Sequence, residues 1–231
     1  MRQPVATILA GAATVAVLAG SPCHGARAQQ APATSIKLPE VRRQGAMSLE
    51  AALWARHSTR TLTKDSISLA DVGQLLWAAQ GVNRPDGHRT APSAGATYPL
   101  ELYLLAARVR DLPAGVYHYK LAGHELESLA TGDRLPELVT TATRQTWIAD
   151  AAVVVVFAGA FDRTAGRYRD RTDRYIAIEV GAAGQDLYLQ AAALGLGTTM
   201  VGSFQDSTLS RVVGLPAGQR PIAVMPVGRP R

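Results

Sequence analysis

The sequence contains little cysteine and few aromatic residues. Cys23 is the only cysteine among 231 residues, so the chain can form no internal disulfide and has no second thiol for a zinc site. Aromatic residues make up 6% of the chain, charged residues 18% and hydrophobic residues 47%. Repeats of solenoid length and low-complexity tracts are absent as well. The composition is that of one globular domain with a hydrophobic core.

Several common catalytic and binding motifs are also missing. The chain has no Gly-x-Ser-x-Gly elbow and no phosphate loop ending in Gly-Lys-Ser/Thr. Gly195-Leu196-Gly197 follows a predicted helix rather than a strand, so helix capping explains it better than a dinucleotide fingerprint. No metal site is expected, because the histidines beyond the first 28 residues lack ligand spacing: His57, His88, His118 and His124. The 24 basic residues exceed the 18 acidic ones without forming long runs, which favours a defined anion site over nucleic acid.

The N-terminal segment resembles a secretory signal peptide. Arg2 precedes an apolar run from Val5 to Gly20, and Ala26-Arg27-Ala28 fits a small-x-small cleavage site. The pattern predicts cleavage near Ala28 and a periplasmic or secreted protein without a stable membrane span, with an uncleaved anchor as the alternative. The predicted domains are a signal peptide (1–28), a linker (29–46) and one folded domain (47–231).

Helices and strands alternate irregularly in the folded domain, which predicts an α+β fold. Ser48 caps a helix over 49–56, and Ser68 with Asp71 forms a capping box for a second helix that stops at Gly81. The pattern also predicts a helix over 135–145 and strands over 100–107, 116–119, 125–129, 151–160, 198–203 and 221–227. The longest predicted helix, 174–194, is rich in small residues and contains two internal glycines. Each glycine costs about 1 kcal/mol relative to alanine, so the helix is expected to approach another helix or a ligand closely.

Four clusters are candidates for a binding site. Arg56-His57-Ser58-Thr59-Arg60 places two guanidiniums around two hydroxyls, which suits a phosphate, although a solvated helix end has the same composition. The segment 89–99 is small, polar and stiffened by prolines, so it could lie flat against a planar ring. The segment 200–206 runs from a strand into a helix and offers backbone amides. The last segment, 225–231, is a buried strand that ends in cations.

Together these clusters resemble the nitroreductase superfamily and, within it, the SagB/ThcOx-type dehydrogenase branch. The resemblance rests on six strings in register: 56–60, 76–84, 90–95 with 98–101, 113–119, 193–197 and 226–230. It implies an α+β fold with a central mixed or antiparallel sheet, flanking helices and a long central dimer helix. It further implies a homodimer that holds two FMN molecules at its interface.

The resemblance also assigns roles to individual residues. Arg56, His57, Ser58 and Arg60 would hold the phosphate and ribityl chain of FMN, with Arg229 as a further phosphate partner. Pro92, Ser93, Ala94 and Gly95 would approach the ring system from the other subunit. Val201, Gly202 and Ser203 would line the ring, with one of their amides facing N5.

The resemblance implies an exported FMN oxidoreductase, with NAD(P)H as a candidate electron donor and a small organic or peptide-derived substrate. Azoline-oxidising members of the branch carry a Lys-Tyr pair where this chain has Arg167-Tyr168. Arginine cannot act as a base near neutral pH, so azoline oxidation is not predicted and Arg167 and Tyr168 are the candidate catalytic residues. The alternative is a flavin-binding or storage protein without turnover.

Overall fold

The computed structural model describes Met1 and residues 34–231, and residues 34–231 belong to one compact unit. The predicted signal peptide therefore lies, apart from Met1, outside the described residues. The segment expected as a linker begins there as well, but its described part is no linker. Ser35–Lys37 (β1) pairs with the edge of the sheet, Leu38 is buried, and the Arg42 amide donates to Gln74 Oε1 at 2.9 Å.

A seven-stranded antiparallel sheet forms the centre of the unit, in the order β1-β6-β5-β3-β7-β9-β8. A separate parallel pair is formed by β2 and β4. Beyond β1, the strands are β2 (Ile67–Ser68), β3 (Leu100–Ala106), β4 (Val109–Arg110), β5 (Gly115–Lys120), β6 (Glu125–Thr131), β7 (Val153–Ala160), β8 (Gly197–Thr198) and β9 (Gln219–Gly228). The helices are α1 (Leu49–Ala55), α2 (Leu69–Gln80), α3 (Leu135–Glu137), α4 (Asp162–Tyr168), α5 (Thr172–Ala193) and α6 (Asp206–Val213). Four shorter helical segments are η1 (Ala94–Ala96), η2 (Leu138–Thr143), η3 (Thr146–Asp150) and η4 (Arg169–Arg171).

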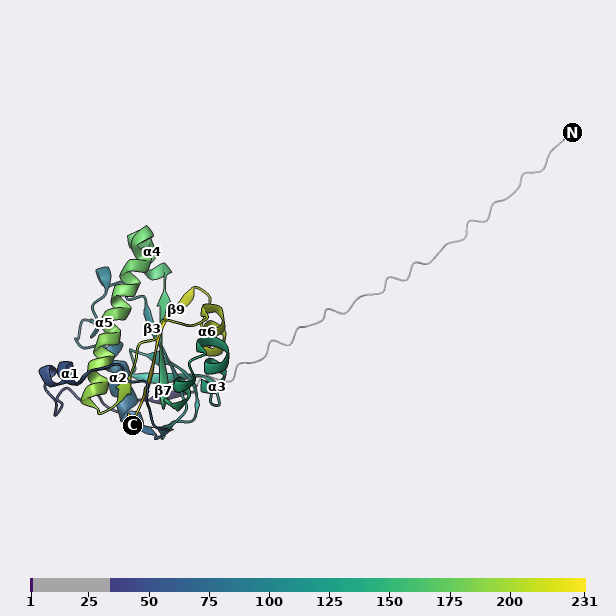
Figure 1. The fold of residues 1–231 in the computed structure, drawn as a ribbon. Helices are drawn as coiled ribbons and strands as arrows, with labels where there is room; N and C mark the ends of the chain where they lie inside the picture. Colours follow the sequence, from purple (N-terminus) through teal and green to yellow (C-terminus); the bar gives the residue numbers. More distant parts are fainter. Residues whose placement is uncertain (2–33) are drawn as a thin grey trace. The chain divides into compact units, whose positions relative to one another are not determined.

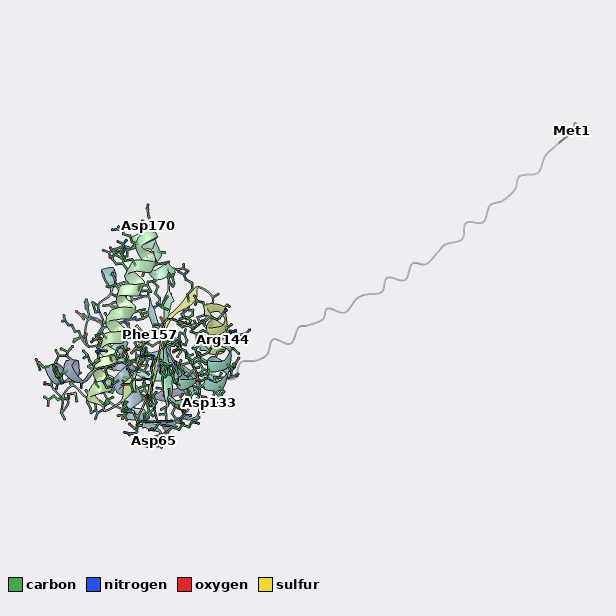
Figure 2. All side chains as sticks on the ribbon, viewed as in Figure 1. Met1, Asp65, Asp133, Arg144, Phe157 and Asp170 are labelled. Atoms are coloured by element: carbon green, nitrogen blue, oxygen red, sulfur yellow. The ribbon has the colours of Figure 1, made fainter. Side chains whose placement is uncertain are left out.

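Helices cover both faces of the sheet, so the unit has three layers and the predicted α+β fold is confirmed. Helices α2 and α5 lie on one side of the central strands, and α3 and α6 lie on the other (Figure 1). Each side has its own hydrophobic cluster. The central strand β7 is buried along nearly its whole length, which explains its four consecutive valines. Phe157 of this strand lies in the interior, while Asp170 lies at the tip beyond α4 (Figure 2).

Local signals in the sequence placed several elements correctly. The Ser48 cap and the Ser68–Asp71 capping box are both present. The prediction of a regular α-helix over 135–145 is wrong. A single α-turn leads into a π-helix, which ends at Arg144 with a φ of 54°. Three threonines in this stretch disfavour a regular α-helix because their branched Cβ atoms crowd the preceding turn. In the described part of the chain, no helix combines the length and apolar character that crossing a membrane requires.

The long helix α5 shows the predicted close approach at only one of its two glycines. The Met200 side chain lies against Gly184, at a place where a Cβ atom would collide with it. At Gly181 a Cβ atom would meet nothing within 4 Å, and the residue is exposed. One side of α5 therefore packs within the chain, while the side that carries Gly181 is open.

Candidate functional site

The segment from Arg56 to Arg60 is fixed against the start of β8. The Thr59 amide donates to the Thr198 carbonyl at 2.9 Å, and the Thr199 hydroxyl donates to the Thr59 carbonyl at 2.8 Å. Gly197 makes this contact possible, since a Cβ atom there would lie 2.7 Å and 2.9 Å from two carbon atoms of the Thr59 side chain. The segment is thus a well-positioned strand-like extension and not a frayed helix end.

A cavity of about 170 Å³ opens beside this segment, between the end of α1 and the last turns of α5. Its lining includes Arg56, His57, Thr59 and Tyr188. Among the described residues, no carboxylate lies within ion-pair distance (4.0 Å) of Arg56 or Arg60. Arg56 therefore brings an uncompensated guanidinium to the cavity beside the Thr59 and Tyr188 side chains, which fits a bound phosphate, whereas Arg60 is exposed on the same segment and does not line the cavity.

Tyr188 connects the parts of this cluster, although no sequence motif marks it. Its hydroxyl accepts a hydrogen bond from the Met200 amide at 2.7 Å and lies 3.2 Å from Ser58 Oγ. The Arg56 guanidinium lies 5.2 Å from the centre of its ring, within cation–π range. Because a tyrosine in a helix of small residues forms no recognisable pattern, only the folded structure reveals that Tyr188 joins the Arg56–Arg60 segment to the chain before Val201.

Two amides remain candidates in the segment 201–203. Val201 is buried, and its amide donates to the Val224 carbonyl at 2.9 Å, so it has no hydrogen left for a ring atom. Gly202 and Ser203 are exposed, and their amides have no backbone acceptor within the described chain. The amide of Gly202 or Ser203 would therefore donate the hydrogen bond to an acceptor atom on a ring. Val201 could line the ring but could not donate to it.

Two other residues assigned to the phosphate have partners of their own. The Nδ1 atom of His57 lies 2.9 Å from the Ala55 carbonyl, at the end of α1. Arg229 follows β9, and its Nε atom donates to the Ser66 carbonyl at 3.4 Å. His57 lines the cavity and Arg229 directly precedes Pro230, which also lines it, but neither side chain is held toward Arg56 by an interaction within the described residues.

The second predicted group assembles around the loop 92–98. Arg167 Nη1 donates to the Gly95 carbonyl at 3.2 Å, and a Cβ atom on Gly95 would lie 2.6 Å from the Tyr168 hydroxyl. Tyr168 is half-buried, and its ring packs against Tyr175 with the ring centres 4.4 Å apart. The structure thus places both candidate catalytic residues directly on the loop predicted to lie against the ring.

A buried carboxylic acid lies close to this loop, and its environment was not predictable from local sequence. Glu179 of α5 is 2% exposed, and its Oε1 atom has no hydrogen-bond partner within the described chain. Burial raises the pKa of this carboxyl. The carboxyl lies next to the strand and loop that carry Leu100 and Ser93, and its interactions with Ser93, Arg89 and Gln80 oppose the effect of burial on the pKa.

The two groups lie at opposite ends of α5. Tyr168 precedes the helix and Tyr188 is in its last turns, while α4 and α1 mark the two ends (Figure 1). At a rise of about 1.5 Å per residue, Thr172 and Tyr188 are roughly 24 Å apart along the axis. The loop contacts Arg167 and Tyr168 before the helix and Glu179 within its first half, whereas the phosphate cluster contacts Tyr188 near its end, so the two groups occupy different levels of α5.

Comparison with known proteins agrees with this architecture. The nitroreductase family model matches residues 53–229. A candidate nitroreductase of Methanocaldococcus jannaschii, MJ1384, is 37% identical over 84% of this chain and 96% of its own length. A crystal structure of a candidate nitroreductase from Ralstonia eutropha JMP134 superposes with a TM-score of 0.73 at 30% identity, covering 85% of this chain and 90% of the other. The microcin B17-processing protein McbC of Escherichia coli is 28% identical over 69% of this chain and 60% of its own length.

The antiparallel sheet with helices on both faces and the long helix α5 define an α+β domain of the oxidoreductase class to which the family model belongs. The chain belongs to the nitroreductase family, and its likeness to McbC supports the SagB-type branch. The resemblance inferred from the six strings is confirmed.

The predicted periplasmic or secreted location is wrong. The Methanocaldococcus jannaschii relative is matched over 96% of its own length, so the shared domain accounts for almost the whole of that protein. Export therefore forms no part of the function considered below.

Proposed function

We propose that this chain is an FMN-dependent oxidoreductase that works as a homodimer, with each flavin held between two subunits. One observation carries the proposal: a phosphate-type cluster and a ring-facing loop lie at opposite ends of α5 in the same chain. A second copy running in the opposite direction brings the loop of one subunit to the phosphate cluster of the other. Two such composite sites then form by symmetry.

The open side of the molecule supports this arrangement. Helix α1 exposes Leu49, Leu53 and Trp54, with Trp54 93% exposed, and α5 exposes Ile178 by 61%. Large apolar side chains that gather on one helix in this way are typical of an interface between subunits. Gly181 is exposed as well and leaves room for a partner helix.

The described residues fit the parts of FMN. Arg56 and Arg60 lack an internal counter-ion and can bind the phosphate, and Ser58 offers a hydroxyl to the ribityl chain. Gly202 and Ser203 offer amides, and the loop 92–95 offers a small, flat surface for the ring. When bound, FMN would supply the hydride chemistry, with NAD(P)H as the candidate donor.

In this proposal the chain itself positions the loop beside the flavin ring and supplies a proton donor. Arg167 donates a hydrogen bond to the Gly95 carbonyl, and its proposed role is to hold the loop in place. Tyr168 places its hydroxyl beside the same loop and is the candidate acid. McbC is a microcin-processing protein, which makes a peptide-derived substrate as reasonable a candidate as a small organic acceptor.

The test is whether the purified chain carries flavin and turns over. Full-length protein should bind FMN with one flavin per chain, lose its visible flavin absorbance on addition of NAD(P)H, and regain it with an electron acceptor. Bound flavin that no donor reduces would favour the alternative, a flavin-binding protein without turnover. Protein that takes up no FMN would contradict both.

The subunit arrangement has its own test. Ile178→Asp places a charge on the proposed interface and should convert a dimer into a monomer in sedimentation velocity, with loss of flavin in parallel. Leu129→Asp is the matched control, because Leu129 is 43% exposed on β6, away from α1 and α5. A wild-type monomer that binds a full complement of FMN would refute the composite site.

A further inference from the structure

A cavity of about 480 Å³ lies within the loop that joins α2 to β3, and the proposed flavin contacts use only its rim. Pro92, Ser93 and Gly95 belong to both the rim and the ring-facing loop. The rest of the lining comes from Asn83, Arg84, residues 88–91, Ala96 and Tyr98. The volume is that of a site for a small organic molecule.

The cavity carries an excess of positive charge. Arg84, His88 and Arg89 line it. Asp86 is engaged by His88, with 2.7 Å between Nδ1 and Oδ1. Within the described residues, no carboxylate lies within 4.0 Å of the guanidinium of Arg84 or Arg89. Two arginines thus border the cavity, and Arg89 is attracted by Glu101 and Glu179 without forming an ion pair with either within 4.0 Å.

Arg89 is held in a fixed position rather than extended into solvent. Its Nη1 atom donates to Gln80 Oε1 at 2.8 Å and to the Leu100 carbonyl at 3.3 Å, and Gln80 is fully buried. Its guanidinium lies 4.4 Å from the centre of the Tyr98 ring. Only one of its nitrogens is used in these hydrogen bonds, so donors remain for a ligand in the cavity.

The backbone of the same loop is strained. Gly95, Ala96 and Tyr98 have φ values of 57°, 53° and 44°, and the left-handed region is unfavourable for alanine and tyrosine. The strain is maintained by the Tyr98 amide, which donates to Ser93 Oγ at 2.9 Å, and by Arg163 Nη1, which donates to the Tyr98 carbonyl at 3.0 Å. Strain of this kind is concentrated where a loop must hold one shape for a ligand.

We infer that this cavity binds the carboxylate of a planar organic acid, with Arg89 as the fixed anchor and Arg84 as the outer cation. As a substrate site the inference rests on the proposed function, because the cavity adjoins the ring-facing loop. The nitrogens of Arg89 that are free of hydrogen bonds can bind the two oxygens of a carboxylate side by side. The ring of the acid packs against Pro92, Ala96 and Tyr98.

The test compares benzoate with its neutral isostere benzamide by isothermal titration calorimetry on the flavin-loaded protein. Benzoate should bind and benzamide should bind at least about fivefold more weakly, as expected for loss of a charged contact. Arg84→Gln should weaken benzoate by up to about fivefold, because Arg84 is exposed, and should leave benzamide unchanged. Arg84→Lys should retain most of the affinity. Arg211→Gln, the same change of charge on α6, is the control.

A second variant probes the anchor. Arg89→Gln should weaken benzoate by about tenfold or more, provided that its melting temperature shows a folded protein. Arg84→Gln needs no such proviso, because its side chain is exposed and makes no hydrogen bond within the described chain.

The outcomes separate this inference from the proposed function. Equal affinity for benzoate and benzamide, or benzoate binding unchanged in both arginine variants, would overturn the carboxylate site. Loss of flavin in Arg84→Gln with benzoate binding intact would assign the cavity to the cofactor phosphate instead, and would also overturn it. If the wild type takes up no FMN, the proposed function fails, whereas the same titrations on the flavin-free protein still decide whether the cavity binds the acid.

Discussion

Replacing Arg56 and Arg60 together with alanine is expected to remove FMN from an otherwise intact protein. The Arg56–Arg60 segment is held by backbone and threonine contacts to Thr198 and Thr199, which neither arginine side chain makes. The substitution therefore leaves the segment and the cavity in place and removes the two positive charges of the segment, of which Arg56 lines the cavity.

The magnitude follows from the two charged hydrogen bonds to the phosphate that the substitution removes. A hydrogen bond to a charged group contributes about 1.5–3 kcal/mol, so two arginines account for about 3–6 kcal/mol of binding. This corresponds to a rise in Kd of roughly a hundredfold to ten-thousandfold. The free energy of unfolding should fall by no more than about 1 kcal/mol, since within the described residues the two side chains make one interaction, that of Arg56 with the Tyr188 ring.

The assay is a titration of FMN into flavin-free protein, followed by quenching of flavin fluorescence, with thermal unfolding measured in parallel. Arg134→Ala combined with Arg211→Ala is the matched control, because both side chains are cationic and lie away from α1 and β8. A change in Kd below about fivefold, or one that the control variant reproduces, would refute the phosphate assignment.

Three further substitutions test other parts of the structure. Gly197→Ala should destabilise the fold by about 1–3 kcal/mol in chemical denaturation and weaken FMN binding, because the new Cβ atom would overlap Thr59; unchanged stability would mean that the two segments are not in tight contact. Tyr188→Phe should weaken FMN binding and lower stability by about 0.5–1.5 kcal/mol, since the Met200 amide loses its acceptor, and a variant identical to wild type would remove Tyr188 from the site. Burial raises the pKa of Asp186 from 3.8 to about 6, so the folded state favours the protonated carboxyl and stability is lost as pH rises across that interval. Asp186→Asn should therefore match wild type near pH 4 and exceed it by about 1–2 kcal/mol at pH 7, after allowance for solvent screening of this partly exposed group; equal stability at both pH values would contradict the raised pKa.

Elements specified by local chemistry could be predicted well. Ser48 and Ser68 begin their helices because a side-chain oxygen beside the first turn satisfies free amides, and both partners lie within three residues. The four valines of β7 indicate a strand buried on both faces. The sequence did not predict the π-helix at Leu138–Thr143. It also predicted a strand over 198–203, whereas the structure has a shorter strand at Gly197–Thr198. At Met200 the amide turns to Tyr188 and the side chain packs over Gly184, contacts that no local pattern encodes.

The sequence by itself determined the fold class, the family and the residue types of the phosphate and ring segments, because these depend on short strings and on periodicity along the chain. The tertiary structure decided which of those residues act together. It joined Ser58 to Tyr188 across 130 positions, excluded the Val201 amide by pairing it with Val224, and separated the two half-sites along α5. These contacts join residues that are far apart in the sequence. They depend on how the helices and strands pack against one another, which short sequence patterns do not specify.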